Sequence, residues 1–223
     1  LYKAKKLFDK KFDSERELYC CSFSADTIVY KGLVMPSEFD SFYSDLSDTS
    51  HRTASVMFHI RFSTNTSPKW HLAQPYRVIA HNGEINTISG NRNWALARMN
   101  NLSSKRFGNM RKYQPLVNQS GSDSSSLDNM IEVLKEGGVN IGRAARMLIP
   151  PSWQNTDLMD SDEKAFHEYN SMHMEAWDGP ALICFQDKNF LSCFLDRNGL
   201  RPAKIEFFND ETVCISSEFG SNN

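Results

Sequence analysis

A two-residue alternation of apolar and polar side chains extends from residue 54 to residue 63. Apolar residues occupy the even positions from Ala54 to Phe62, while His59 and Arg61 stand at odd positions between them. Every second side chain of a strand lies on the same face. The pattern predicts a strand with one apolar face, from which His59 and Arg61 project toward a polar surface or site.

The remaining pattern predicts antiparallel strands and helices in blocks. Strands are expected at 76–81, 181–186, 190–195 and 212–217, with a hairpin at 18–30. Helices are expected at 91–102, 141–148 and 161–172, with an amphipathic helix around 127–134, an exposed helix within 1–17 and a short helix with loops at 36–52. Ser122, Asp123 or Ser124 is expected to begin the amphipathic helix, and Gly137 to end it. This order favours a mainly antiparallel α+β fold.

Composition narrows the class of protein. The chain has 223 residues, of which 40% are hydrophobic and 23% charged, as in one large globular domain or two small ones. A net charge of −2 gives no electrostatic case for binding nucleic acid or an anionic membrane surface. No apolar run approaches the roughly 20 residues that span a bilayer, and the first residues lack the apolar core of a secretory signal. We expect neither nucleic acid nor a membrane as a partner.

The cysteines do not indicate a metal site. They lie in apolar, strand-like stretches, none forms a CxxC pair, and none has metal-ligand spacing: Cys20, Cys21, Cys184, Cys193 and Cys214. Free cysteine is among the most buried residue types. We therefore expect five buried, reduced thiols.

Three short segments, 61–66, 81–86 and 121–126, carry the groups that amide hydrolysis requires. The Asn82 amide and the Gly83 N–H fit an oxyanion hole, because glycine lets a backbone donor approach closely. Arg61 fits a carboxylate, which pairs bidentately with guanidinium, and Asp123 fits an ammonium group. Other interpretations are an Asn-Gly turn, a surface ion pair of Arg61, and a helix N-cap at Asp123.

These segments, together with several longer ones in the same order, resemble the glutamine amidotransferase domains of glutamate synthases. The longer segments are Tyr30-Lys31-Gly32-Leu33, Trp70-His71-Leu72-Ala73-Gln74-Pro75, Pro150-Pro151-Ser152-Trp153-Gln154-Asn155, Trp177-Asp178-Gly179-Pro180-Ala181 and Leu195-Asp196-Arg197-Asn198-Gly199-Leu200-Arg201-Pro202. Several long matches in order are more specific than one short motif. Ala176 departs from the proline expected before Trp177.

The resemblance implies a class II amidotransferase with the N-terminal-nucleophile hydrolase fold. This fold is an αββα sandwich of two antiparallel sheets between helical layers. Residues 1–223 would form the C-terminal part, and most, of one glutaminase domain, and the sandwich would be incomplete at its N-terminus. The catalytic cysteine would lie upstream, so we expect the isolated fragment to be inactive. Exposed sheet edges and apolar surface would make it poorly stable.

The resemblance also implies the reaction and the partners. The parent enzyme would hydrolyse L-glutamine and pass the ammonia to an FMN site for reductive amination of 2-oxoglutarate. Asn82 and Gly83 would stabilise the tetrahedral intermediate, Arg61 and Asp123 would hold the amino-acid end, and Thr64 would contact substrate backbone atoms. FMN and an iron–sulfur cluster would belong to the other domains, with none in this fragment. Ferredoxin or an NAD(P)H-linked subunit would donate electrons, in the cytoplasm or a plastid.

Several alternatives remain open from the sequence. A class II amidotransferase could serve another ammonia acceptor, or the chain could be a non-catalytic glutamine-binding module. The class uses the α-amine of its first cysteine as the base, so we expect His59 and His81 to be structural. Trp94, Trp153 and Trp177 are expected to pack in a core or an interface.

Overall fold

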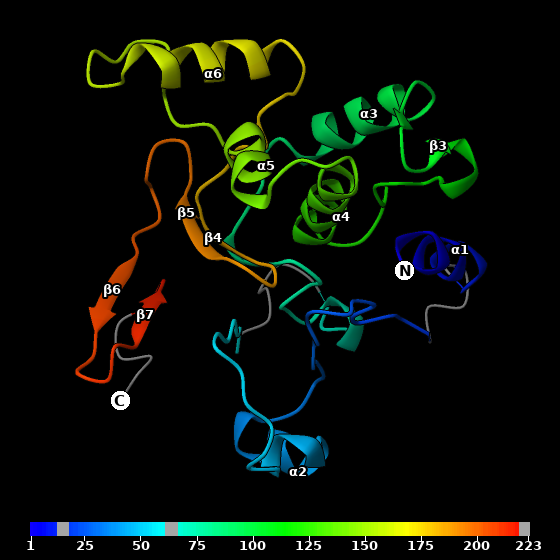
Figure 1. Ribbon diagram of the computed structural model, residues 1–223, viewed down its shortest axis with the longest axis vertical. Coiled ribbons are helices and arrows are strands. Elements are labelled where there is room, and N and C mark those ends of the chain that lie inside the picture. The colour runs from blue at the N-terminus through cyan, green and yellow to red at the C-terminus, as the bar shows by residue number, and fades with distance from the viewer. Residues whose placement is uncertain (13–17, 61–66, 219–223) are drawn as a thin grey trace.

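The computed structural model describes residues 1–12, 18–60 and 67–218. Its helices are α1 (Tyr2–Phe12), α2 (Phe39–Phe42), α3 (Ile88–Met99), α4 (Asp123–Glu136), α5 (Ile141–Leu148) and α6 (Ser161–Ser171) (Figure 1). Its strands are β1 (Ile79–Gly83), β2 (Ser103–Ser104), β3 (Gly108–Asn109), β4 (Ala181–Gln186), β5 (Leu191–Leu195), β6 (Lys204–Phe207) and β7 (Val213–Ser216). Short 3₁₀ helices cover Pro36–Glu38, Ser44–Ser47, Trp70–Leu72 and Met110–Tyr113.

Three antiparallel sheets are present in the described part of the chain. The largest has the order β1-β4-β5, and the pairs β2–β3 and β6–β7 form the other two. In the large sheet Asn82 lies opposite Leu182, and Gly83 lies opposite Ala181. Strand β4 also pairs with β5, so it is the central strand and holds β1 in register. The antiparallel α+β class predicted from the sequence is therefore confirmed.

Polar side chains fix where the helices begin. The Ser122 hydroxyl accepts from Ser125 N and caps α4, and the Asn140 side chain accepts from Gly142 N and Arg143 N at α5. Asp160 caps α6 by accepting from Glu163 N. These caps satisfy backbone donors that have no partner within the helix. The predicted positions of all three helices are confirmed, and Ser122 is the residue that caps α4.

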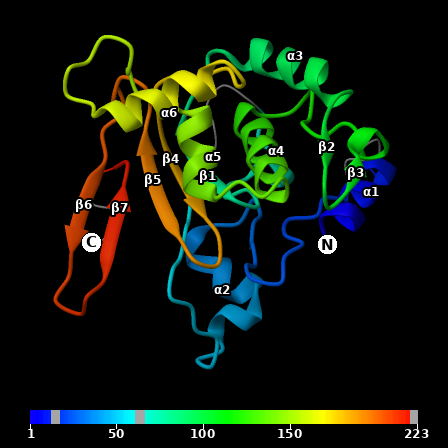
Figure 2. The same ribbon diagram turned by 45° about the horizontal axis from the view of Figure 1, so that its top comes forward.

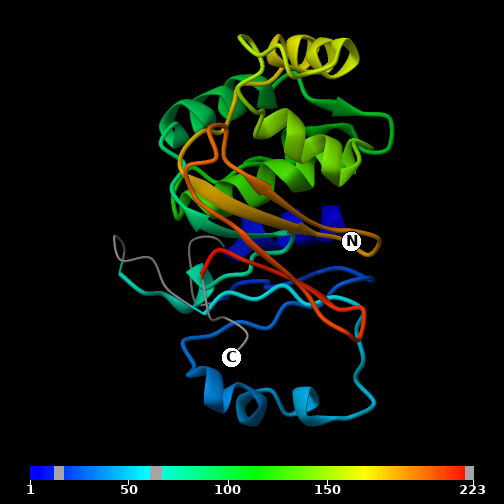
Figure 3. The same ribbon diagram turned by 90° about the vertical axis from the view of Figure 1, so that its left-hand side faces the viewer.

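One face of the large sheet packs against α4 and α5. Ile79 and Phe185 of the sheet share a core with Leu127 and Ile131 of α4 and Leu148 of α5. Each fully buried aliphatic or aromatic side chain contributes roughly 1.5–3 kcal/mol relative to an exposed one. Figure 2 shows these helices against the sheet, and in Figure 3 α2 lies on the opposite side of it. The other face of the sheet is thus left for the site.

The N-terminal helix is less exposed than the sequence predicts. In α1 the side chains of Tyr2, Lys5 and Lys6 are buried. Tyr2 packs with Met99 and Leu116, Lys5 pairs with Glu132, and Lys6 Nζ donates to Leu116 O at 3.1 Å. The prediction of an exposed helix was wrong for this face, because charged groups on α4 compensate buried lysines.

Two strand predictions were wrong for the described residues. Residues 18–30 and 54–60 contain no strand. The exposed fraction of the side chains still alternates along 54–60, but the apolar set is on the exposed side. Val56, Phe58 and Ile60 are 64%, 57% and 75% exposed, whereas His59 is half-buried. These apolar side chains therefore do not pack against a core, as the two-residue period predicted that they would. Arg61 and Phe62 lie outside the described residues.

Smaller differences concern strand ends and packing. The strand predicted at 76–81 begins at Ile79 and continues through Asn82 and Gly83, which do not form a turn. Strands β2, β3 and β6 were not predicted. Trp177 is 2% exposed, as predicted for a core residue, whereas Trp94 is 56% exposed and carries Arg98 over its ring. All five cysteines are free but half-buried, so the prediction of full burial was wrong.

Candidate functional site

The backbone N–H groups of β1 point alternately toward β4 and toward the open edge of the sheet. Glu84 N donates to Pro180 O and Gln186 N to Val78 O, so every second residue of β1, including Asn82, bonds to β4. The N–H groups of Ile79, His81 and Gly83 consequently face away from β4, toward the open edge. This alternation determines which backbone donors are available to the site.

Two side chains occupy the first donors of this edge. Asp128 Oδ1 accepts from Val78 N at 2.8 Å and Ile79 N at 3.3 Å. The Gln74 amide accepts from His81 N at 2.7 Å and donates to His81 O at 2.8 Å, like a residue of a neighbouring strand. The next donor in the series, Gly83 N–H, has no hydrogen-bond partner within residues 1–12, 18–60 and 67–218. It is available to a substrate oxygen.

Gly83 is required by the close approach of β1 to β4. Its φ of 147° lies in a region that L side chains rarely adopt. A Cβ built there would lie 2.0 Å from Pro180 O and 2.7 Å from Ala181 Cα, both backbone atoms. Glycine therefore places its N–H where no other residue fits without moving β4.

The Asn82 side chain is already engaged. Its Nδ2 donates to Ser217 Oγ at 2.7 Å and, more weakly, to Glu218 Oε1 at 3.4 Å. Both acceptors immediately follow β7, so the end of the β6–β7 hairpin meets β1 at this amide. An oxyanion bound here must take at least one of the two amide hydrogens from these acceptors.

Asp123 connects α4 to the turn after β1. It is the first residue of α4, where the helix dipole favours a negative charge. Its Oδ2 accepts from Ile85 N at 2.8 Å, and its Oδ1 accepts from Ser124 N at 2.6 Å. The helix cap is Ser122, so the predicted N-cap interpretation of Asp123 was wrong. Ser124 Oγ also donates to Oδ1, at 3.1 Å, so it is Oδ2 that keeps a further lone pair for an ammonium group.

His81 is a buried, neutral residue. It is 2% exposed, and its Nδ1 lies 2.8 Å from Ser124 Oγ. Burial lowers the pKa of His81 to about 4. A ring with such a pKa is uncharged and only weakly basic near neutral pH, which agrees with the structural role predicted for it.

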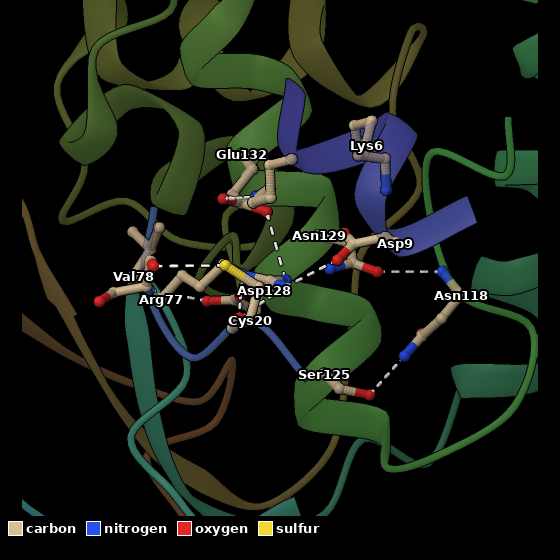
Figure 4. Close-up of polar contacts among 12 residues, drawn as sticks. Lys6, Asp9, Cys20, Arg77, Val78, Asn118, Ser125, Asp128, Asn129 and Glu132 are labelled. Atoms are coloured by element: carbon tan, nitrogen blue, oxygen red, sulfur yellow. Dashed lines mark hydrogen bonds and ion pairs between the residues drawn. The ribbon is translucent and has the colours of Figure 1, made fainter. Parts of the chain in front are cut away.

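A buried charge cluster lies where α1 meets α4 (Figure 4). Arg77 pairs with Asp9 at 3.4 Å and with Glu132 at 3.9 Å, and Lys5 also pairs with Glu132. Asp128 lies beside this cluster with no exposed surface, and its Oδ2 has no hydrogen-bond partner among the residues that the structure describes. Burial, followed by repulsion from Glu132, raises the pKa of Asp128 to about 6. Because Asp128 accepts hydrogen bonds from Val78 N and Ile79 N, protonation of its carboxylate is linked to the stability of the edge of β1.

We expect Asp128→Asn to change how stability depends on pH. The raised pKa of Asp128 means that the folded state holds this proton more tightly, so its stabilisation is present below about pH 4 and is lost as pH rises to about 6. The loss is roughly 3 kcal/mol, from about 1.4 kcal/mol per pKa unit. His81 acts oppositely, because its lowered pKa makes stability fall as pH drops from 6.5 to about 4.

Comparing the Asp128→Asn variant with wild type at each pH separates the effect of Asp128 from that of other titrating groups. Hydrogen exchange of the β1 amides, corrected for intrinsic rates, is measured in the full-length protein between pH 4 and pH 8. The introduced asparagine keeps an acceptor for Val78 N, so the variant should gain protection relative to wild type as pH rises. Asp157→Asn, at an exposed position, is the matched control. A constant difference across this range would contradict the assignment.

The groups at β1 and at the start of α4 line one open cleft of about 1640 Å³. Asn82, Gly83 and Asp123 all lie along it, as the sequence predicted for one site. Arg61 and Thr64 lie outside the described residues. Ile60 and Ser67, the described residues on either side of that segment, both line the cleft.

Sequence reasoning missed the residues that hold the donors in place. Gln74, Ser124 and Asp128 each bond to β1, and Ser217 bonds to the Asn82 amide. Gln74 and Ser124 belong to segments that the sequence singled out, but nothing in the local pattern marks Asp128 and Ser217. Among the residues described, no group of three or more His, Cys, Asp or Glu side chains could hold a metal ion. None of the described helices is both long and apolar enough to span a membrane.

The family model for class-II glutamine amidotransferases matches residues 1–223, and this chain belongs to that family. Its curated relatives are glutamate synthases. The NADPH large chain of Bacillus subtilis is 46% identical over 205 residues, covering 92% of this chain and 14% of the relative.

Relatives from other organisms agree. The NADH glutamate synthase of Schizosaccharomyces pombe is 41% identical and covers 99% of this chain and 11% of the relative. The ferredoxin-dependent glutamate synthase 2 of Synechocystis is 43% identical, covering 99% and 14%. This chain therefore spans between a tenth and a sixth of the length of these relatives.

Proposed function

We propose that this chain is the glutaminase part of a glutamate synthase, in which L-glutamine is hydrolysed to glutamate and ammonia. The observation that carries the proposal is the unpartnered Gly83 N–H beside the Asn82 amide at the cleft. Two fixed donors at adjacent positions suit the oxyanion of a tetrahedral intermediate. That every relative reported above is a glutamate synthase favours this function over a different ammonia acceptor.

In this proposal the attacking thiol belongs to a cysteine outside residues 1–223, whose α-amine acts as the base. The thiol sulfur attacks the side-chain amide carbon, and the carbonyl oxygen moves toward Asn82 and Gly83 as charge develops on it. Ammonia then leaves, and water releases glutamate. The Asn82 amide donates to this oxygen in place of Ser217. Residues 1–223 in isolation accordingly show no turnover.

The amino-acid end of glutamine is assigned to the other predicted residues. Asp123 binds the α-ammonium group through the lone pair of Oδ2 that Ile85 N leaves free. Arg61 binds the α-carboxylate, and Thr64 contacts backbone atoms of the substrate. The support for these two assignments is the position of Ile60 and Ser67 on the cleft.

We expect Asp123→Asn to weaken glutamine binding. Asparagine retains one acceptor oxygen but loses the charge that pairs with ammonium. A hydrogen bond to a charged group contributes roughly 1.5–3 kcal/mol, so KM should rise about 10- to 100-fold. Asp160→Asn is the matched control, because it makes the same change at the start of α6, away from the cleft. An equal KM for both variants would contradict the assignment.

The rest of the parent enzyme completes the reaction. We propose that residues 1–223 form most of one domain with the αββα sandwich arrangement, since residues 18–60 lie beyond the large sheet from α4 and α5 (Figure 3). FMN and an iron–sulfur cluster are assigned to the remaining domains, which reduce the imine formed from ammonia and 2-oxoglutarate. Ferredoxin or an NAD(P)H-linked subunit supplies electrons. The compartment is the cytoplasm or a plastid.

Isotope labelling tests the proposal. The full-length protein is given glutamine labelled with heavy nitrogen at its amide, unlabelled 2-oxoglutarate and a reductant. The proposal predicts that the label appears in the amino group of newly formed glutamate, with an equal amount of unlabelled glutamate from hydrolysis. Label retained entirely in glutamine would overturn it, and label released only as ammonia would leave a glutaminase without the synthase step.

A further inference from the structure

Two cysteines face each other across the β4–β5 hairpin. Cys184 of β4 is the register partner of Cys193 of β5, and their Sγ atoms are 2.8 Å apart. Both line the open cleft, and both are half-buried. Neither has a place in the hydrolysis proposed above, so the pair requires its own account.

The hydrogen-bond pattern shows which kind of pair this is. Asp187 N donates to Phe190 O, and Asp196 N donates to Ala181 O. Bonded and non-bonded pairs alternate along an antiparallel ladder, so counting from either end makes Cys184 and Cys193 a non-bonded pair. Cα atoms of such pairs are about 4.5 Å apart, at the short end of the range of about 4.4–6.8 Å seen in disulfides. The separation of the two strands at this pair is therefore within the range that a disulfide can bridge.

We propose that Cys184 and Cys193 form a reversible thiol–disulfide pair that a small-molecule disulfide, such as oxidised glutathione, converts to a cross-strand disulfide. This site is independent of glutamine hydrolysis, and only its effect on activity rests on the proposed function.

The two sulfurs are suited to different steps of this exchange. Either sulfur can donate in the contact between them. With the Cys184 S–H as donor, the hydrogen bond lowers the pKa of Cys193, while the same hydrogen bond and burial raise the pKa of Cys184. Cys193 is therefore the attacking thiolate and Cys184 the resolving thiol. By contrast, burial raises the pKa values of Cys20 and Cys21, whose thiols donate to backbone oxygens.

The chemistry balances in two exchanges. The Cys193 thiolate attacks one sulfur of oxidised glutathione, the glutathione S–S bond breaks, and one glutathione leaves as a thiolate. Cys184, having lost its proton, then attacks Cys193 Sγ in the mixed disulfide and expels the second glutathione. Two protein thiols are oxidised, one small disulfide is reduced, and the two protons end on the two released glutathione thiols.

The new bond lies close to the candidate oxyanion donors. Cys184 shares a strand with Leu182 and Ala181, which lie opposite Asn82 and Gly83 in β1. Disulfides favour a Cα separation of about 5.5–6 Å, so forming one in a narrow pair shifts β4 against β5. Because β4 holds β1 in register, this shift moves the donors, and a displacement of about 1 Å lowers rates roughly 100-fold in well-aligned sites.

Differential alkylation of the full-length protein tests the pair. The protein is incubated with oxidised glutathione, its free thiols are blocked, and peptides are mapped by mass spectrometry before and after dithiothreitol. We expect a peptide cross-link between Cys184 and Cys193 that dithiothreitol removes, and a roughly 10- to 100-fold slower glutamine hydrolysis that recovers with it. Cys193→Ser should abolish both effects. The matched control, Cys214→Ser, removes a third thiol on the same cleft and should preserve them.

Each other outcome has a definite meaning. If both thiols remain open to alkylation, or if only mixed glutathione adducts form, the pair is refuted. A cross-link that dithiothreitol cannot remove refutes its reversibility, and a cross-link without slower hydrolysis refutes the coupling to β1. If the cross-link forms and reverses while the reduced protein does not hydrolyse glutamine, the pair stands and the proposed function fails.

Discussion

Replacing Asn82 by alanine in the full-length protein is expected to lower kcat for glutamine hydrolysis by about 100- to 1000-fold, which is the usual effect of removing one oxyanion donor. KM should change little, because the donor acts on charge that develops only after attack. Steady-state release of glutamate from glutamine measures both constants. The side chain lies on the cleft face of β1, away from the core shared by Ile79 and Phe185, so the fold should persist.

The matched control for Asn82→Ala is Ser217→Ala. It removes the acceptor that holds the Asn82 amide at 2.7 Å and leaves the donor itself intact. We expect its kcat to stay within a few-fold of wild type. If both variants lost activity equally, the contact between β1 and the segment after β7 would be the important feature, and Asn82 would not be an oxyanion donor.

Gly83→Ala is expected to abolish glutamine hydrolysis and to destabilise the sheet. Its Cβ would lie 2.0 Å from Pro180 O and 2.7 Å from Ala181 Cα, so β1 and β4 must separate. Overpacking and backbone strain each cost about 1–3 kcal/mol, which together approach the stability of many domains. The expected result is loss of activity together with faster hydrogen exchange in β1 and β4.

Gly90→Ala serves as the comparison for Gly83→Ala. Gly90 lies within α3, and a Cβ there would have nothing within 4 Å. Alanine should therefore stabilise this helix by roughly 0.5–1 kcal/mol and leave the rate unchanged. Similar exchange and activity in the two variants would show that the close approach of β1 to β4 is unimportant.

Local pattern was sufficient for elements whose partners are near in sequence. The apolar positions of α4, the span of α5 and the β4–β5 hairpin all appear within a few residues, and the structure confirms each. The strand predicted at 54–60 failed because a strand exists only when a ladder partner pairs with it, and that partner is distant in sequence. The hairpin predicted at 18–30 did not form although its two halves are near in sequence. Residues 54–60 do alternate with a period of two, but the half-buried side chains are those at the odd positions, and the apolar ones at the even positions are exposed.

The residues of the site also fall into two groups, those that the local sequence identifies and those that it does not. Asn82, Gly83 and Asp123 could be selected by chemical type, and the structure places all three on one cleft. Their supports could not be selected, because Gln74, Ser124 and Asp128 act through contacts with β1 that depend on tertiary packing. The availability of Gly83 N–H follows only from the β1–β4 register, which no local pattern contains.

The most direct measurement is a crystal structure of the full-length protein with glutamate γ-semialdehyde bound. The adduct of this aldehyde with the attacking thiol resembles the tetrahedral intermediate of glutamine hydrolysis. We predict that its oxygen lies about 2.7–3.1 Å from both Asn82 Nδ2 and Gly83 N, with the ammonium group beside Asp123. An adduct oxygen held by other donors, with the Asn82 amide still bonded to Ser217, would contradict the proposed site.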